Sequence, residues 1–395
     1  MSGNLNYLLS AYSVKPYAGS EPGLGWYWLK ELVKHKYKIF LVTESEFEKE
    51  LDDWIKKENI KNIEVLYVSI GKLGRRLCWD QGSWIFYLFY RIWQFKAFLI
   101  SLYKWRKIEF KFVHHLNMIG YRELGFQWIR KGVKILGPLG GMNRVSDGFD
   151  KSFKNKFIRK IKHTLNFISF YDPIVFSALN LSNFILAANS ESQSELSRRG
   201  FNPFLLNETG VEDYSIYNSD KKEYDLIFVG KLVERKQPDL FIEIVKEISK
   251  HNKDIKSLII GDGPMREFLQ KQIKKEKLPI ELKIRVDRNE VLRCMGMSKL
   301  MLFPSIDEGT PWVILEALSV GIPVLSHDCC GMADIIDNDF LISPISFDDS
   351  VIEFSNLAIR TLKLTNFKYD ISKHFWAKKI DNYLKLINNK QLLKW

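Results

Sequence analysis

Short apolar runs recur along the chain, and most are followed by a turn and then by a longer amphipathic segment. The first of these units has an apolar run at Asn6–Ala11, a Gly- and Pro-rich loop at Lys15–Gly25 and helical periodicity at Trp26–His35. Short buried strands that alternate with amphipathic helices are typical of a parallel sheet covered by helices. The pattern therefore predicts an α/β fold.

The same unit recurs to the end of the chain. Further strands are predicted at Lys38–Thr43, Ile63–Val68, Phe110–His115, Val133–Leu136, Phe184–Ala188, Phe204–Leu206, Asp225–Val229, Ser257–Ile260, Glu281–Val286, Leu300–Phe303 and Val324–Ser326. Further helices are predicted at Phe47–Glu58, Trp84–Tyr103, Lys151–Lys162, Ser190–Arg199, Pro238–Lys250, Met265–Lys275, Asn289–Met297, Val313–Ser319 and Phe367–Ile387. Because both halves repeat the unit, we predict two Rossmann-like domains that face a cleft. We place them at residues 1–212 and 213–366, with a polar linker at Ile216–Tyr224.

The stretch Phe303–Gly331 contains a strand, a loop, a short helix and the start of another strand, and it holds two acids. Glu308 lies in the loop, and Glu316 lies inside the helix. We expect Thr310 to be the N-cap of this helix and Pro311 to be its first residue. The loop follows the carboxyl end of a strand, which is where open α/β sheets bind ligands.

Free N–H groups at the Gly309-Thr310-Pro311 helix start would form an anion site between the two acids. This arrangement suits a nucleotide-sugar, with Glu308 at the sugar, the N–H groups at the diphosphate and Glu316 at the ribose hydroxyls. The alternative is an ordinary Rossmann-like turn in which Glu316 is a solvated helix residue.

The composition of the chain indicates how many domains it can form and in which compartment it is expected. The chain has 395 residues, 46% of them hydrophobic, which is enough for two cored domains. Its four cysteines (Cys78, Cys294, Cys329 and Cys330) show no CxxC spacing, which argues for a reducing compartment and against a zinc site or a disulfide scaffold. The first residues do not have the pattern of a cleavable signal, so we expect a cytoplasmic protein.

Positive charge is concentrated in one segment. The net charge is +12, and residues 72–162 alone carry 20 Lys and Arg against 5 Asp and Glu. Such a segment predicts an anionic partner, which can be a nucleic acid, lipid headgroups or a phosphorylated acceptor.

The aromatic segment Trp84–Tyr103 lies within this basic region and is interrupted by Arg91 and Lys96. It is long enough to span a membrane, but the two cations and the basic flanks favour an interfacial helix. We expect residues 72–107 to hold the protein on the anionic inner face of the cell membrane, with Arg91 and Lys96 among the headgroup contacts. The alternative is a buried helix whose Arg and Lys side chains extend to solvent.

The sequence E-G-T-P-x4-E-A-L-x-x-G-x-P-V, which begins at Glu308, resembles the signature of the retaining glycosyltransferases of family 4, whose fold is GT-B. Glu308 and Glu316 match the E-x7-E pair of that family. The resemblance implies a last helix that returns to the first domain, and it implies the donor contacts described above. It also implies that Lys231 and Lys236 bind the donor diphosphate, although an Arg is usual at the first position. Gly261 and Gly263 match another Gly-rich donor loop of the family.

Two elements of the first half resemble a subset of the same family. The loop that contains Gly19, Ser20, Glu21 and Gly23 matches G-S-E-P-G-x-G-W, which in that subset faces the donor diphosphate and the acceptor. The glycines Gly140 and Gly141 match the end of a W-G-P-x-G-G element, with Leu136 where an aromatic is usual. We expect Gly140 and Gly141 to let the backbone approach the first loop or the acceptor. A plain β–α turn is the alternative for the first loop.

His114 and His115 end a predicted strand, where family members often carry a His near the donor sugar. Side chains alternate along a strand, so only one of the two is expected to face the cleft.

The family resemblance implies transfer of a sugar from a nucleotide-diphosphate donor, such as a UDP- or GDP-sugar, with retention of anomeric configuration. No metal ion is expected, because the cations and the helix start can neutralise the diphosphate. A literal D-x-D is present at Asp337-Asn338-Asp339, but it lies beyond the core unit. Glu308 is compatible with a nucleophilic role and with a positioning role, and an internal-return mechanism needs no protein nucleophile.

The expected acceptor is a lipid-linked or oligosaccharide intermediate of bacterial capsule, exopolysaccharide or O-antigen synthesis, and no nucleic acid is expected as a partner. Rivals are another two-Rossmann sugar enzyme, such as a phosphorylase or an epimerase, and a non-catalytic protein on a GT-B scaffold that binds membranes or nucleic acid. The non-catalytic reading does not explain the two acids or the Gly-rich loops.

Overall fold

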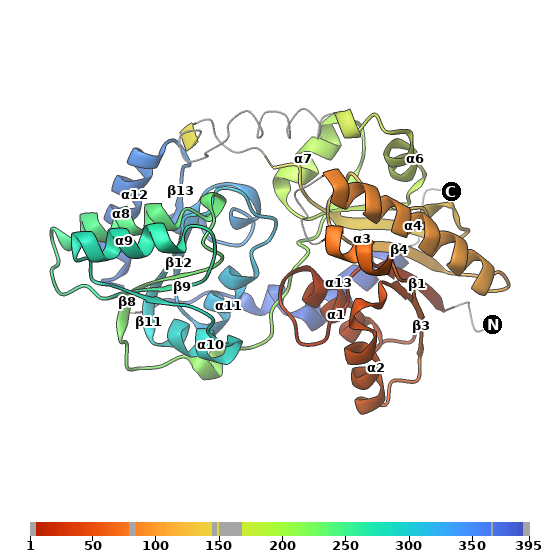
Figure 1. Ribbon diagram of the computed structural model, residues 1–395, viewed down its shortest axis with the longest axis horizontal. Coiled ribbons are helices and arrows are strands. Elements are labelled where there is room, and N and C mark those ends of the chain that lie inside the picture. Colours follow the sequence, from red (N-terminus) through yellow and green to blue (C-terminus); the bar gives the residue numbers. More distant parts are fainter. Residues whose placement is uncertain (1–4, 79–83, 144–147, 150–167, 365, 390–395) are drawn as a thin grey trace. The chain divides into compact units, whose positions relative to one another are not determined.

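The computed structural model describes residues 5–78, 84–143, 148–149, 168–364 and 366–389, which form two compact units (Figure 1). Unit 1 contains the described residues up to Met142, those from 168 to Glu208, and those from Trp376 onward. Unit 2 contains the described residues of 143–149 and the segment Thr209–Phe375. The predicted basic helix Lys151–Lys162 lies outside the described residues.

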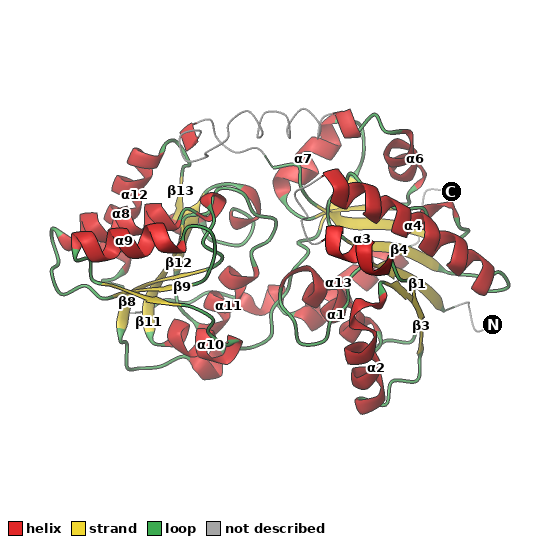
Figure 2. Cartoon of the chain, viewed as in Figure 1, coloured by secondary structure: helices red, strands yellow, loops and turns green. Residues whose placement is uncertain are grey.

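Unit 1 contains a seven-stranded parallel sheet in the order β3-β2-β1-β4-β5-β6-β7. Figure 2 draws strands in yellow and helices in red, and it labels β1, β3 and β4 of this sheet. Its strands are β1 (Asn6–Ala11), β2 (Lys38–Thr43), β3 (Ile63–Tyr67), β4 (Phe112–Asn117), β5 (Val133–Leu139), β6 (Phe184–Ala187) and β7 (Pro203–Leu205). Its helices are α1 (Ser20–Leu32), α2 (Glu48–Lys57), α3 (Gly71–Cys78), α4 (Trp84–Lys104), α6 (Pro173–Leu181), α7 (Ser190–Arg198) and α13 (Trp376–Asn388). The strand order reverses between β1 and β4, so their carboxyl ends form a switch point.

Helix α1 begins six residues before the predicted start, at Ser20 rather than Trp26. The segment was predicted to be a loop because it contains Pro22 and several glycines. Proline is tolerated in the first turn of a helix, where its missing N–H would have no intrahelical acceptor. The helix dipole favours the negative charge of Glu21 in the same turn, although burial opposes that charge.

The last helix, α13, belongs to unit 1, as predicted, although it follows unit 2 in the chain. Trp376 stacks on Tyr27 of α1 with ring centroids 5.1 Å apart. Further along, Tyr383 is fully buried and its hydroxyl bonds to that of Tyr7 on β1 at 2.5 Å. The C-terminal helix therefore completes the core of the N-terminal unit.

Unit 2 contains a six-stranded parallel sheet in the order β10-β9-β8-β11-β12-β13. Its strands are β8 (Tyr224–Val229), β9 (Ser257–Ile260), β10 (Ile280–Lys283), β11 (Ser298–Phe303), β12 (Val324–His327) and β13 (Leu341–Ile342). Its helices are α8 (Pro238–Ser249), α9 (Arg266–Glu276), α10 (Arg288–Gly296), α11 (Trp312–Val320) and α12 (Phe347–Thr361). Here the switch point lies between β8 and β11.

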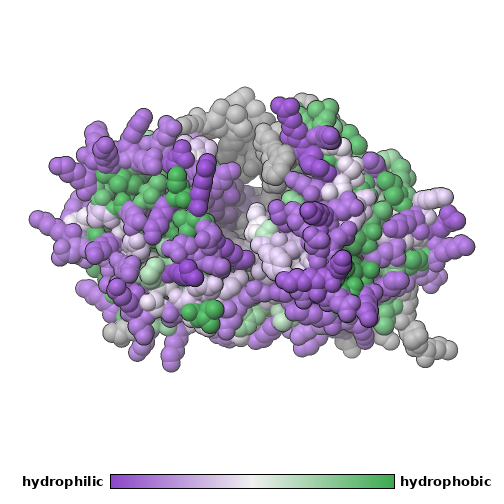
Figure 3. Space-filling view, turned by 60° about the horizontal axis from the view of Figure 1, so that its bottom comes forward, coloured by the Kyte–Doolittle hydropathy of each residue, from purple (hydrophilic) through white to green (hydrophobic). Residues whose placement is uncertain are grey.

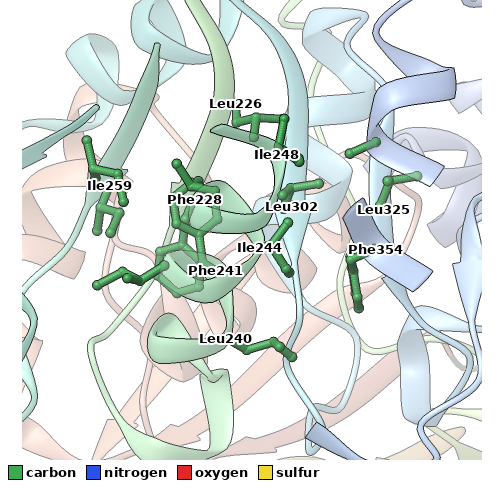
Figure 4. Packing of buried hydrophobic residues seen from close by; sticks show 14 of the residues in the cluster. Leu226, Phe228, Leu240, Phe241, Ile244, Ile248, Ile259, Leu302, Leu325 and Phe354 are labelled. Carbon is green, nitrogen blue, oxygen red and sulfur yellow. The ribbon is translucent and has the colours of Figure 1, made fainter. Parts of the chain in front are cut away.

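Alternate side chains of each unit 2 strand point to opposite faces of the sheet, and both faces are covered. On one face Leu226 and Phe228 of β8 pack against α8 and α12 (Figure 4). On the other face Ile227 and Val229 pack in the cluster formed with α10 and α11. This burial on two sides explains why the strands are continuous apolar runs.

Asn143 and Phe149 belong to unit 2, although the sequence placed them in the first domain. Phe149 is fully buried and packs edge-to-face on His327, with ring centroids 5.2 Å apart. Asn143 donates hydrogen bonds to the loop after β11. Apolar burial and hydrogen bonding with unit 2 thus decide their placement.

Hydrophilic residues cover most of the face shown in Figure 3, and apolar residues gather in patches among them. In the described residues, one helix (Ile85–Lys104, within α4) is long and apolar enough to cross a membrane, and 39% of the tested window is buried.

Candidate functional site

The acids and cations singled out in the second half meet at the β8–β11 switch point of unit 2. Lys231 and Lys236 lie in the loop after β8, and Glu308 lies in the loop after β11. Because β8 and β11 are neighbours in a parallel sheet, both loops leave the same edge of the sheet.

Glu308 is held by two cations. Its Oε1 atom lies 2.6 Å from Lys236 Nζ and 2.7 Å from Arg235 Nη1. The Ser305 hydroxyl donates to the same oxygen at 2.9 Å. The loop backbone is fixed as well, since Asn143 Nδ2 donates to the Glu308 carbonyl at 2.7 Å. The carboxylate is therefore preorganised by side chains from both loops.

Electrostatics keep this carboxylate ionised. Burial would raise the pKa of Glu308, but the nearby Lys236 and Arg235 outweigh burial and lower it. Burial lowers the pKa of Lys236, and Glu308 opposes that effect. An acid with a lowered pKa is a poor proton donor, so Glu308 is suited to accept hydrogen bonds or to face positive charge.

Lys231 and the start of α11 provide the remaining positive charge. Lys231 is exposed, and its ammonium has no ion-pair partner among the described residues. Helix α11 begins at Trp312, with Pro311 rather than Thr310 as N-cap, because Pro311 has an extended backbone (ψ 116). The helix still starts a few residues after Glu308 and Gly309, at the sheet edge where N–H groups of a helix start favour an anion.

Glu316 is largely buried and paired, so the reading of it as a solvated helix residue is wrong. Its Oε1 atom accepts hydrogen bonds from Arg288 Nε at 3.1 Å and Arg288 Nη2 at 2.6 Å. Arg288 also donates to the Tyr214 hydroxyl at 2.8 Å. Burial raises the pKa of Glu316, and Arg288 opposes this shift.

Gly261 and Gly263 bring the loop after β9 against the loop after β8. A Cβ on Gly261 would lie 1.9 Å from the Gly230 carbonyl oxygen, and one on Gly263 would lie 2.5 Å from the Leu232 carbonyl oxygen. These close approaches require glycine. The described contacts of both glycines are thus with neighbouring loops, and their expected role in donor binding stays a prediction.

The candidate residues of unit 1 lie at its own switch point. Gly19 is the N-cap of α1, and Ser20, Glu21 and Gly23 lie in the first turns rather than in a loop. Gly140 follows β5, and its N–H donates to the Ile119 carbonyl at 2.8 Å, next to the end of β4. Gly141 has a positive φ of 84, which favours glycine.

His114 and His115 lie inside β4, which continues to Asn117, so they do not end the strand. Both are buried. His114 bonds to the Tyr7 hydroxyl at 2.6 Å and to the Gly137 carbonyl at 2.6 Å. Burial lowers the pKa of His114 to about 3 and that of His115 to about 4. The described structure encloses both rings in unit 1, and a catalytic role for either stays a prediction.

The D-x-D residues Asp337 and Asp339 are exposed, around a short 3₁₀ turn (Asn338–Phe340). Among the described residues, no three His, Cys, Asp or Glu side chains cluster as metal ligands would.

Two arginines of this cluster were not predicted from the sequence. Arg235 contacts Glu308 and Arg288 contacts Glu316, yet the family pattern drew attention to the lysines on either side of Arg235. The signal that was available was three consecutive charges, Glu234, Arg235 and Lys236, in a loop after a buried strand.

Comparison with known proteins identifies first the class of fold. A structure of S. aureus TarM, in a complex that includes UDP, has a TM-score of 0.60 at 12% identity and covers 97% of this chain and 100% of that chain. The chain therefore has two Rossmann-like units of the GT-B class.

Most of unit 2 also matches a protein family by sequence. Residues 212–366 match the family Glycosyl transferases group 1, and they contain Lys231, Arg235, Lys236, Glu308 and Glu316. The 2-deoxystreptamine N-acetyl-D-glucosaminyltransferase of Niallia circulans is 26% identical over 176 residues, or 42% of this chain and 45% of that protein.

A second relative is the UDP-Gal:alpha-D-GlcNAc-diphosphoundecaprenol alpha-1,3-galactosyltransferase of Escherichia coli. It is 29% identical over 143 residues, or 35% of this chain and 37% of that protein. This chain thus spans less than half the length of these two relatives.

Proposed function

We propose that the protein is a glycosyltransferase that moves a sugar from a nucleotide-diphosphate-sugar to a lipid-linked glycan, with retention of configuration. The observation that carries the proposal is the Glu308 carboxylate between Arg235 and Lys236 at the β8–β11 switch point. This cluster lies within the residues that match the glycosyl transferase family. The UDP in the TarM structure and the undecaprenol acceptor in the name of the E. coli relative support the choice of donor and acceptor.

Transfer breaks the bond between the anomeric carbon and the diphosphate, and it forms a bond from that carbon to an acceptor hydroxyl oxygen. The diphosphate gains negative charge as it leaves, and Lys231, Lys236 and the start of α11 are arranged to stabilise it. The acceptor proton passes to the departing diphosphate. Glu316 and Arg288 would hold the ribose end of the donor.

Glu308 acts by positioning in this account. Three donors already engage its Oε1 atom, and an oxygen so engaged is a weak nucleophile. An ionised carboxylate beside the donor sugar accepts hydrogen bonds from its hydroxyls and favours the positive charge that develops on the ring.

The direct experiment uses purified protein, radiolabelled UDP- and GDP-sugars and a bacterial lipid extract. The expected result is a labelled lipid product with the anomeric configuration of the donor. Glu308→Gln should lower the transfer rate roughly 100-fold or more, as loss of a preorganised electrostatic contact does. Asp339→Asn, an exposed control, should leave the rate unchanged. A product of inverted configuration would contradict the retaining mechanism.

We also propose that α4 rests on the anionic inner face of the cell membrane. One face of this 21-residue helix packs on unit 1 through Phe86, Tyr90, Trp93 and Ala97. On the other face, apolar side chains that are 38–74% exposed recur at intervals of three and four residues, and they include Leu88, Ile92, Phe95, Leu99 and Leu102. A helix with one packed face and one apolar exposed face is suited to lie in an interface rather than to cross the bilayer.

The cations available to headgroups are not the two that the sequence suggested. Arg91 pairs with Glu123 at 2.8 Å and with Asp172 at 2.7 Å, and Lys96 donates to the Ser69 carbonyl at 2.9 Å. Arg91 and Lys96 are thus engaged by the protein itself. Lys72, Arg76 and Lys107 are also exposed, and none of the three makes such a contact with the part of the chain that the structure describes.

Flotation with liposomes tests this surface. Ile92→Ser with Phe95→Ser should lower binding to phosphatidylglycerol vesicles, and high salt should lower binding of the wild type. Ile216→Ser, at an exposed apolar residue of unit 2, is the matched control. Binding that is unchanged in the double variant would contradict docking through α4.

A further inference from the structure

A cavity lies between three helices that cover one face of the unit 2 sheet. Helix α8 packs against both α9 and α12 on this face (Figure 1). The cavity has a volume of about 410 Å³, which is within the range of ligand pockets. Its lining includes Asp239 and Glu243 of α8, Phe268 and Gln272 of α9, and Phe347 and Asp348 at the start of α12. The candidate site around Glu308 contributes no described residue to this lining.

The charged side chains of this lining are acidic. Asp239, Glu243 and Asp348 carry three carboxylates, and no Lys or Arg of the described chain lines the cavity. Glu243 has a cation nearby, Lys246 at 3.6 Å, but that ammonium lies closer to Glu276, at 2.6 Å. The cavity is thus acidic in a chain whose net charge is +12. These carboxylates favour a ligand of positive charge.

Two of the lining residues have an oxygen atom without a hydrogen-bond donor. Asp239 Oδ1 and Gln272 Oε1 are shielded from solvent, and neither accepts a hydrogen bond from the residues that the structure describes. The Gln272 amide is oriented by its Nε2 atom, which donates to Glu243 Oε1 at 2.7 Å. Burial raises the pKa of Asp239, and the charges of Glu234 and Glu243 add to the shift, although backbone N–H groups at the helix start oppose it. A ligand that completes these two oxygens must carry hydrogen-bond donors.

Phe268 adds an aromatic surface to the cavity. Its side chain is 57% exposed, whereas Phe347 and Val351 are half-buried and pack on the hydrophobic core beneath them. The face of an aromatic ring attracts positive charge, and the attraction is strongest for groups that can lie flat on the ring. An exposed ring beside carboxylates is therefore suited to a planar cation.

A guanidinium group meets these requirements. It is planar, stays charged, carries five N–H donors and stacks on aromatic rings. A metal ion is less suited, because no three His, Cys, Asp or Glu side chains cluster as metal ligands in the described part of the chain. An arginine side chain is the common source of such a group in proteins.

The surface beside the cavity indicates that the arginine belongs to a polypeptide. Ile352 of α12 is 58% exposed, and it lies four residues after Asp348, on the same face of the helix. A small free cation would not cover Ile352. A protein segment that places an arginine in the cavity and an apolar neighbour on Ile352 would use both.

We propose that this cavity is a docking site for an arginine side chain of a partner protein. The guanidinium group lies on the Phe268 ring and donates hydrogen bonds to Asp239 and Gln272, which stand on neighbouring helices. The inference goes beyond the proposed function and does not depend on it.

The test follows the Val351 methyl signals of the whole chain by NMR while a peptide is added. Val351 lines the cavity, and Val351→Ile identifies its signals. The probe is a short peptide with one arginine between leucines, and two further peptides carry lysine or citrulline, a neutral isostere of arginine, in its place. We expect a saturable shift with the arginine peptide and roughly 10-fold weaker binding of the citrulline peptide, because charge-assisted hydrogen bonds are lost.

Two variants test the residues that carry the inference. Asp239→Asn should weaken binding of the arginine peptide roughly 10-fold. Phe268→Ala should weaken it roughly 2- to 5-fold, and its melting temperature should match the wild type because the side chain is exposed. Asp254→Asn, at an exposed acid of unit 2 outside the cavity, is the matched control and should bind as the wild type does.

No saturable shift with the arginine peptide, or equal affinity for the arginine and citrulline peptides, would overturn the inference. Unchanged affinity in both Asp239→Asn and Phe268→Ala would do the same. A lysine peptide that binds as tightly as the arginine peptide would overturn the choice of a guanidinium group. Sugar transfer is measured separately, and its absence would contradict the proposed function alone.

Discussion

Glu308, Arg235 and Lys236 together carry one excess positive charge at the edge of the unit 2 sheet. Two cations on one carboxylate leave the carboxylate ionised and leave positive charge for a ligand. Lys236 also lies 4.7 Å from the centre of the Phe303 ring, so its position is fixed by packing as well as by charge. A substitution of Lys236 therefore tests whether this particular cation, and not only the net charge of the site, is needed to bind a ligand.

Lys236→Met should weaken nucleotide-diphosphate binding and lower stability. Glu308 would stay buried with one cation fewer. Breaking a buried ion pair costs about 3 kcal/mol, and we expect a smaller loss of roughly 1–2 kcal/mol because Arg235 still pairs with Glu308. Calorimetric titration and denaturant unfolding measure the two effects. In the double variant Lys236→Met with Glu308→Gln, stability should recover and nucleotide affinity should not. Independent, additive losses of stability would contradict the coupling.

Glu21→Gln should make the protein more stable at high pH. The pKa of Glu21 is higher in the folded state than in the unfolded state, so its proton stabilises the fold, and this contribution is lost as pH rises from about 4.5 to about 7. The Gln variant lacks that loss, so at pH 8 it should be more stable by roughly 1–3 kcal/mol. Urea unfolding at pH 8 and pH 4.5 measures the difference. A difference in stability between the two proteins that is equal at both pH values would contradict the raised pKa of Glu21.

At the scale of helices and strands, the hydrophobic pattern of the sequence predicts where most elements lie but not all of their ends or exposed faces. Most strands and helices lie where short apolar runs and helical periodicity predicted them, because burial is the main constraint on those residues. The start of α1 was missed because Pro22 and its neighbouring glycines are also typical of loops. The sequence favoured an interfacial helix at α4 but did not show which residues form its exposed face, because aromatic and aliphatic residues occupy both faces of the helix.

Gly261→Ala should disrupt the loop packing that supports the unit 2 site. Its Cβ would lie 1.9 Å from a backbone oxygen of Gly230, so the loops after β8 and β9 must separate. The expected cost is about 1–3 kcal/mol, as for overpacking, together with weaker nucleotide binding. Gly19→Ala is the control, because its Cβ meets nothing within 4 Å. Thermal melting of both variants measures this, and equal melting temperatures would contradict the packing account.

At the scale of the whole molecule, repeated strand–loop–helix units were sufficient to predict two parallel-sheet units. The motif from Glu308 to Glu316 was sufficient to nominate the candidate site of unit 2. Its cationic partners Arg235 and Arg288 were not predicted, because their contacts depend on loops that are distant in sequence. Likewise, the burial of His114 depends on α13, which follows it by more than 200 residues.

Tyr383→Ala should destabilise unit 1 and leave unit 2 protected. Tyr383 is fully buried, and its ring lies 5.5 Å from His114 and 5.0 Å from Trp28. Truncation of a large buried aromatic costs about 3–5 kcal/mol. Hydrogen exchange should become faster in the strands of unit 1, with little change in β8 and β11. Equal loss of protection in both units would contradict the assignment of α13 to the core of unit 1.

The most direct measurement of the central claim is a thermal-shift panel of UDP, GDP, ADP, CMP and dTDP against the wild type, Lys236→Met and Lys256→Ala, with and without EDTA. Lys256 is an exposed lysine immediately before β9, at the amino end of the sheet and opposite the site. A ligand that binds the native state raises the melting temperature. We expect one nucleoside diphosphate to raise the melting temperature clearly. This shift should be unaffected by EDTA, kept in Lys256→Ala and lost in Lys236→Met. No shift with any nucleotide, or an equal shift in all three proteins, would contradict a donor site at Glu308.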